Sequence, residues 1–159
     1  MQKYLLAAVV AIISVSVLAL NIDYAPTVEQ PVREAAVKAP IEKQGIRFFQ
    51  GSFEEALQEA GRQGKPVFVD MHADWCGPCV YMSAEVFPVA EVGEFYNQNF
   101  ISVKVDVEDE RGGEIATAYQ VSGLPTLLYL NSDGGVRYEA LGGLGVQELL
   151  NAGKQALAQ

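Results

Sequence analysis

The sequence has little cysteine, histidine, tryptophan or positive charge. Its 159 residues include two cysteines, one histidine and one tryptophan, and 20 Asp and Glu outnumber 11 Lys and Arg, giving a formal charge of −9. Without a third cysteine no second disulfide can form, which excludes a cysteine-rich secreted scaffold. Phosphate binding needs clustered Lys and Arg, so the negative charge argues against nucleic acid as a partner.

Charge is also scarce at the N-terminus. Lys3 and the α-amine are the only charges before an uncharged, largely apolar run from Tyr4 to Leu20. A run of about 17 residues lies between the length of a secretory h-region and that of a short membrane span. We therefore expect residues 1–20 to be either a signal peptide, cleaved after Ala19, or a retained membrane anchor. In both cases the rest of the chain is exported.

The remaining chain divides into a linker and one domain. Residues 21–45 contain Pro26, Pro31 and Pro40 among charged residues and alanines, without an apolar period, which predicts an extended linker. Half of the chain is hydrophobic, enough for a single core, and we assign residues 46–159 to one domain.

Within this domain the hydrophobic pattern alternates between strand and helix. Ser52, with Glu55 three residues later, predicts a capping box before the first helix, and the composition of residues 131–135 predicts a hairpin turn. Strands are predicted at 46–50, 66–71, 100–107, 127–130 and 136–140, and helices at 53–60, 76–87, 90–97, 114–119 and 146–157. Alternation followed by a hairpin predicts an α/β fold, a mixed central sheet with helices on both faces.

Both cysteines lie in the segment Trp-Cys-Gly-Pro-Cys at 75–79, directly after a predicted strand. Proline is tolerated in the first turn of a helix, where one amide lacks a partner anyway. A helix that begins near Cys76 brings the two cysteine Cα atoms to about 5 Å, within the roughly 4.4–6.8 Å that a disulfide requires. The spacing predicts a redox-active dithiol that needs no bound cofactor.

Three features together resemble the thioredoxin superfamily over roughly residues 48–157. They are the order of elements, the cysteine segment after a strand that contains Asp70, and the Gly-Leu-Pro-Thr segment at 123–126 before the hairpin. The stretch 86–92 departs from ordinary thioredoxin and is more similar to the C-terminal thioredoxin-like domain of the bacterial transmembrane thiol:disulfide interchange protein and to its small exported relatives. The resemblance implies a thioredoxin-like fold and protein thiols or disulfides as substrates.

Three residues are assigned to the chemistry. Cys76 is expected to attack, because unpaired amides and the helix dipole favour its thiolate. Cys79, one turn inward, is expected to resolve the mixed disulfide. Asp70 is the candidate base, since a charged carboxylate is costly to bury in an apolar strand, and the resemblance places a matching acid beneath the second cysteine. Alternatively, Asp70 simply reaches solvent at the end of a strand.

The resemblance also implies a substrate-binding surface. Pro125 matches a proline that thioredoxins hold in cis beside the disulfide, and the Leu124 backbone would pair with an extended substrate segment. Trp75 would cover the site with an apolar face, and Gly77 and Pro78 are assigned to the same surface.

Two further residues have open roles. His72 shares strand parity with Asp70 and either influences the thiol or is an ordinary packed or surface histidine. Lys104 aligns with a lysine that approaches the buried acid in thioredoxin, although a solvent-facing strand lysine is the alternative.

The predicted function is an exported thiol-disulfide oxidoreductase, periplasmic or otherwise extracytoplasmic, and soluble or tethered to the membrane. The Gly-Pro spacer favours a reductant or disulfide interchange protein by analogy, and a reductant in an oxidising compartment needs a membrane-embedded electron donor. The alternative is a copper-delivery or metal-binding module that uses His72, Cys76 and Cys79.

Overall fold

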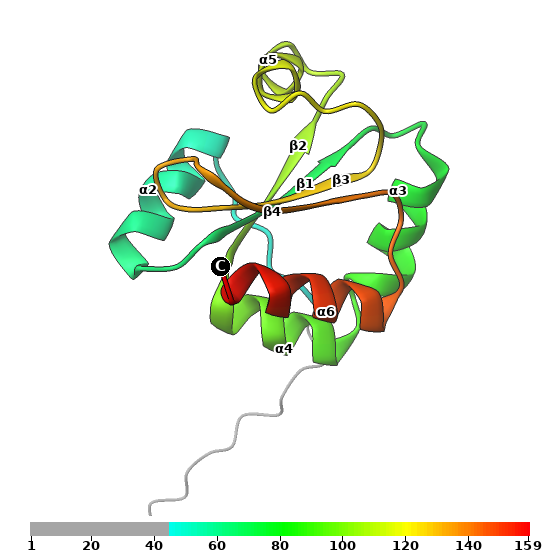
Figure 1. Ribbon diagram of the computed structural model, residues 1–159. Coiled ribbons are helices and arrows are strands. Elements are labelled where there is room, and N and C mark those ends of the chain that lie inside the picture. The colour runs from blue at the N-terminus through cyan, green and yellow to red at the C-terminus, as the bar shows by residue number, and fades with distance from the viewer. Residues whose placement is uncertain (1–44) are drawn as a thin grey trace, which may run out of the picture. The chain divides into compact units, whose positions relative to one another are not determined.

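The computed structural model describes residues 45–159 (Figure 1). The predicted signal peptide or anchor at 1–20 lies outside the described residues, as does the predicted linker at 21–45 apart from its last residue. Among the described helices, none combines the length and the apolar character needed to cross a membrane.

A four-stranded mixed sheet forms the centre of the domain. It consists of β1 (Val67–His72), β2 (Ile101–Asp106), β3 (Thr126–Leu130) and β4 (Val136–Leu141), in the order β2-β1-β3-β4. β1 is parallel to β2 and antiparallel to β3, which is antiparallel to β4. The apolar run predicted as a buried central strand is β1. The predicted mixed sheet is confirmed.

Helices cover both faces of this sheet, as Figure 1 shows. One face packs against α2 (Phe53–Gln63) and α5 (Glu110–Ala118). The other packs against the π-helix η1 (Met82–Val86), α4 (Ala90–Asn99) and α6 (Val146–Leu157). In Figure 1, α4 and α6 run side by side.

Alternation along β1 divides the core between these faces. Val67, Val69 and Met71 belong to the apolar cluster with α2 and α5, and Phe68 belongs to the cluster with η1, α4 and α6. Successive side chains of a strand point to opposite faces. Asp70 therefore shares the face of Phe68, the side on which the cysteine helix continues into η1.

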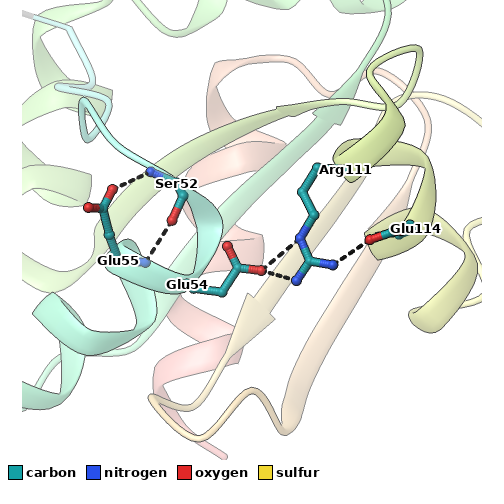
Figure 2. Close-up of polar contacts among 5 residues, drawn as sticks. All are labelled: Ser52, Glu54, Glu55, Arg111 and Glu114. Carbon is teal, nitrogen blue, oxygen red and sulfur yellow. Dashed lines mark hydrogen bonds and ion pairs between the residues drawn. The ribbon is translucent and has the colours of Figure 1, made fainter.

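The predicted capping box begins α2, as Figure 2 shows. Ser52 Oγ accepts a hydrogen bond from the Glu55 amide at 3.1 Å, and Glu55 Oε2 accepts one from the Ser52 amide at 2.7 Å. In the same view, Arg111 of α5 donates to Glu54 of α2, with 3.0 Å between Nε and Oε1, and to Glu114. The hydrogen bond with Arg111 lowers the pKa of Glu54.

The strand predicted at 46–50 is only an isolated bridge between Phe48 and Ser102 of β2. The preceding amides bind elsewhere: Ile46 donates to the Phe87 carbonyl at 2.8 Å, and Arg47 donates to the Asn97 side chain at 2.8 Å. These bonds direct the segment toward the helical layer, so it pairs with β2 at one point only.

The helix predicted at 114–119 begins four residues earlier, because α5 includes both Gly112 and Gly113. A Cβ atom at Gly112 would lie 1.8 Å from the Asp106 carbonyl oxygen. Glycine is therefore needed where α5 approaches the end of β2, and its low helix propensity did not mark the helix boundary.

The cysteine helix has two parts. α3 (Gly77–Tyr81) continues directly into η1, where the Phe87 amide donates to the Met82 carbonyl at 2.8 Å across five residues. The helix ends before Pro88, as predicted. Such π-turns are frequent at functional sites, and this one immediately follows the turn that carries Cys79.

Candidate active site

The two cysteines form a disulfide at the start of α3. Cys76 is the N-cap residue, Pro78 lies in the first turn, and the cysteine Cα atoms are 5.2 Å apart. This agrees with the separation of about 5 Å predicted from helix geometry. Three residues connect the end of β1 to Cys76. The position of the dithiol is therefore set by the central strand that precedes it and by the start of the helix that contains it.

The first sulfur accepts a backbone hydrogen bond. The Cys79 amide donates to Cys76 Sγ at 3.3 Å, and the Cys76 carbonyl accepts from the Val80 amide at 3.0 Å. Once the disulfide is reduced, the same amide and the positive end of the helix dipole favour a thiolate at Cys76. The arrangement fits the predicted role of Cys76 as the attacking thiol, which stays a prediction.

The disulfide lies just below the surface. Cys76 is 4% exposed and Cys79 is 3% exposed. Trp75, by contrast, is 70% exposed, and Gly77 and Pro78 are also exposed. These predicted contact residues therefore present an accessible, partly apolar rim around the first cysteine.

Asp70 is fully buried in the central strand, so the alternative that it reaches solvent is wrong. Its Oδ2 atom accepts a hydrogen bond from Lys104 Nζ at 2.7 Å. Its Oδ1 atom is buried and has no hydrogen-bond partner among residues 45–159. Of the two oxygens of this buried carboxylate, only Oδ2 is therefore paired within the described residues.

Lys104 approaches Asp70 because the two residues are direct partners in the parallel register of β1 and β2. Its ammonium group also donates to Ser83 Oγ at 2.9 Å. The same nitrogen lies 5.0 Å from the centroid of the Phe48 ring and 5.2 Å from that of Phe87. The prediction that Lys104 contacts the buried acid is therefore confirmed.

A cleft of about 430 Å³ opens beside this group. Cys79, Lys104 and His72 all line it, so His72 does lie on the side of the second cysteine. Its role stays a prediction. The complete lining is His72, Ala73, Asp74, Cys79, Val80, Ser83, Ala84 and Lys104.

The predicted proline turn lies at the same end of the sheet. The Leu124–Pro125 peptide bond is cis, and Pro125 is buried directly before β3. Thr126 pairs with Met71 near the end of β1, from which the chain continues toward Cys76. The structure thus places this turn at the end of the sheet that carries the dithiol, while the docking roles of Leu124 and Pro125 stay predictions.

Sequence reasoning missed two residues at this site. A Cβ atom at Gly143 would lie 3.0 Å from Pro78 Cβ, so the loop after β4 approaches the cysteine turn closely. Ser83 contacts Lys104. Only Ser83 had a local indication, because it follows Cys79 by four residues, about one helical turn.

No group of three His, Cys, Asp or Glu side chains in the described part of the chain is arranged to hold a metal ion. The set proposed for copper consists of His72, Cys76 and Cys79, and in this oxidised form the two cysteines are bonded to each other. Metal delivery stays a prediction.

A family model described as Thioredoxin-like matches residues 48–132. The chain belongs to the thioredoxin-like family. This thioredoxin-like protein carries a disulfide of the CXXC type, Cys76–Cys79.

Individual relatives agree with this assignment. The thioredoxin-like protein CITRX of Arabidopsis thaliana, a chloroplastic protein, is 43% identical over 81 residues, which are 50% of this chain and 42% of CITRX. A proposed disulphide-isomerase from Bacteroides thetaiotaomicron has a TM-score of 0.64 and 39% identity, covering 72% of this chain and 94% of that chain. This chain therefore spans less than half the length of CITRX.

The oxidised C-terminal domain of Neisseria meningitidis DsbD has a TM-score of 0.60 and 23% identity, covering 69% of this chain and 99% of that domain. At this identity the likeness shows the fold alone. The predicted thioredoxin-like fold and the predicted superfamily are confirmed.

Proposed function

We propose that this protein is an exported reductant of protein disulfides, recharged by a membrane-embedded electron donor. The observation that supports the chemistry most strongly is the Cys76–Cys79 disulfide at a helix start, beside a cleft where Lys104 pairs with the buried Asp70. One sulfur is set up to attack, and the second lines the same cleft as Lys104, the partner of the buried Asp70.

The reaction cycle transfers two electrons to the substrate. The Cys76 thiolate attacks a substrate disulfide, forms a mixed disulfide and releases one substrate thiolate. Cys79 then loses its proton to Asp70 and attacks Cys76 Sγ. The second substrate thiolate leaves, and the Cys76–Cys79 bond forms. A dithiol of the donor reverses these exchanges and restores both thiols.

Protein substrates are supported by the surface around the disulfide. Trp75 offers a largely exposed aromatic face, and the thioredoxin-like fold suggests protein thiols and disulfides as substrates. Aromatic side chains of this kind are enriched where proteins bind one another. Suitable clients are an apocytochrome thiol pair that has become oxidised or a mispaired disulfide in an exported protein.

The direction of electron flow is tested by the equilibrium reduction potential. The reduced and oxidised protein would be separated after equilibration in glutathione or dithiothreitol buffers. We expect a value near that of thioredoxin, about −270 mV, whereas a value near −120 mV, typical of strong oxidants, would overturn the assignment as a reductant.

Export is supported by the apolar run at 4–20. The test is a fusion of alkaline phosphatase to the C-terminus of the full chain, assayed on intact bacterial cells. Activity is expected for the full chain and not for a matched variant that lacks residues 4–20. Equal inactivity of both fusions, with the protein present, would contradict export. Retention of one tightly bound copper ion by the reduced, purified protein would instead favour metal delivery.

A further inference from the structure

The ammonium group of Lys104 is held by side chains from three separate segments. Asp70 comes from β1, Ser83 comes from η1 with the Phe87 ring directly after it, and the Phe48 ring comes from the segment before α2. Lys104 itself is 31% exposed, because one side of its head group faces the cleft that Cys79 also lines.

Two of these contacts have direction. A lysine ammonium has three donors, and two of them point to Asp70 Oδ2 at 2.7 Å and to Ser83 Oγ at 2.9 Å. The aromatic rings attract the cation without fixing its donors. Of the described side chains, Ser83 is thus the hydrogen-bond acceptor other than Asp70 that orients the Lys104 head group.

We infer that Ser83 is a positioning residue for thiol-disulfide exchange: it holds Lys104 against Asp70, so that the positive charge beside the buried carboxylate is in place when Cys79 has to lose its proton. This inference rests on the proposed function. Without Ser83 the ammonium group can turn into the cleft. The carboxylate then loses part of the counter-charge that favours its charged form over its protonated form.

Other titratable groups share this environment. His72 and Asp74 line the same cleft from β1 and from the loop after it, and Cys79 lines it from α3. Their titration contributes to any pH profile of the site. It is common to the wild type and to Ser83 variants, so the difference between these profiles reports on Ser83.

The experiment follows both exchange steps with dithiobis(nitrobenzoate) and the fully reduced protein. Attack by Cys76 releases one nitrothiobenzoate and leaves a mixed disulfide, and attack by Cys79 on Cys76 Sγ releases the second. The second rate is measured by stopped flow from pH 5 to 9, at reagent concentrations where it no longer depends on the reagent.

We expect Ser83→Ala to move the midpoint of the second release upward by about half a pH unit, and to slow this release about threefold below the midpoint. Hydrogen bonds to charged groups are relatively strong, but exposure of both partners reduces the effect. Ser83→Thr, which keeps the hydroxyl, is expected to restore the profile. Ser132→Ala, in the exposed hairpin turn, is the control.

Lys104→Gln shows whether Ser83 acts through the lysine. In that background Ser83→Ala is expected to cause no further shift. A wild-type profile for Ser83→Ala, or the same additional slowing in the Lys104→Gln background, would overturn the inference. Absence of either release from the wild-type protein would instead reject the proposed function itself.

Discussion

Asp70→Asn tests whether the buried acid accepts the proton of Cys79. The substitution keeps the shape of the side chain but removes its negative charge. The oxygen that has no partner in the described residues, Oδ1, is the atom expected to receive the proton. Asparagine has no oxygen that can take a proton at neutral pH, so Cys79 would have to ionise without a base.

The size of the effect follows from the thiol. A free thiol with a pKa of about 8.5 is only ~3% ionised at pH 7, and apolar burial lowers this fraction further. Cys79 is 3% exposed. If Asp70 removes the proton, its loss slows resolution about 30-fold or more at pH 7. The variant's rate should then rise about tenfold per pH unit up to the pKa of the unassisted thiol.

The two-step nitrothiobenzoate release measures this rate directly, because only the second release requires Cys79. Asp133→Asn makes the same chemical change in the exposed hairpin turn and is the matched control. Thermal unfolding of the oxidised proteins shows whether the fold is intact. A second-release rate within twofold of wild type from pH 6 to 8 would refute the role of Asp70 as the base.

Three other predictions concern trapping, packing and alkaline stability. Cys79→Ser should accumulate thiol-sensitive adducts with proteins of the producing cell and Cys76→Ser should not, as non-reducing gels and mass spectrometry would show; equal trapping by both would exclude Cys76 as the attacking residue. Gly112→Ala places a Cβ atom 1.8 Å from a backbone oxygen and should lower the free energy of unfolding by about 2 kcal/mol or more. Gly61 also lies inside a helix, α2, but a Cβ atom there would have its nearest neighbour 3.7 Å away, so Gly61→Ala should raise the free energy of unfolding by about 0.5 kcal/mol. Denaturant unfolding checks both variants, and similar losses of stability in the two would contradict the packing argument. Burial raises the pKa of Tyr96. Below about pH 10 the tyrosine is neutral in both the folded and the unfolded protein, so its contribution to the free energy of unfolding is complete. Above that pH the unfolded protein ionises first, and the free energy of unfolding decreases by up to about 1.4 kcal/mol per pH unit. Tyr96→Phe should reduce this alkaline slope, and an unchanged slope would show that Tyr96 does not cause it.

Local patterns predicted much of the fold. The bounds predicted for the last helix, 146–157, are those of α6. The hairpin of β3 and β4, the capping box at Ser52 and the helix start at Cys76 also agree with the sequence analysis. In each case the decisive interactions join residues close together in the sequence, so composition and spacing were enough.

The errors arose where distant segments decide the structure. Residues 46–50 have strand-like composition, but Asn97 and the Phe87 carbonyl bind the amides of Arg47 and Ile46. Gly112 indicated a weak helix start, yet it lies inside α5 because the end of β2 leaves no room for a Cβ atom. The sequence alone shows neither the bonds to the amides of residues 46 and 47 nor the close contact between α5 and the end of β2.

The candidate site shows the same division. The spacing of Cys76 and Cys79 predicted the disulfide, and the resemblance placed Lys104 near Asp70. The contact between Ser83 and Lys104 depends on how the π-turn of η1 lies over β2, and a single sequence does not show such a tertiary contact.

Alkylation of the fully reduced protein tests the assignment of the two sulfurs most directly. A brief reaction with iodoacetamide at pH 7 would be stopped with acid, and tandem mass spectrometry would locate the label within the peptide that contains both cysteines. We predict that Cys76 is labelled first and that Cys79 stays largely unmodified. Equal labelling of the two, or faster labelling of Cys79, would contradict an exchange cycle that begins at Cys76.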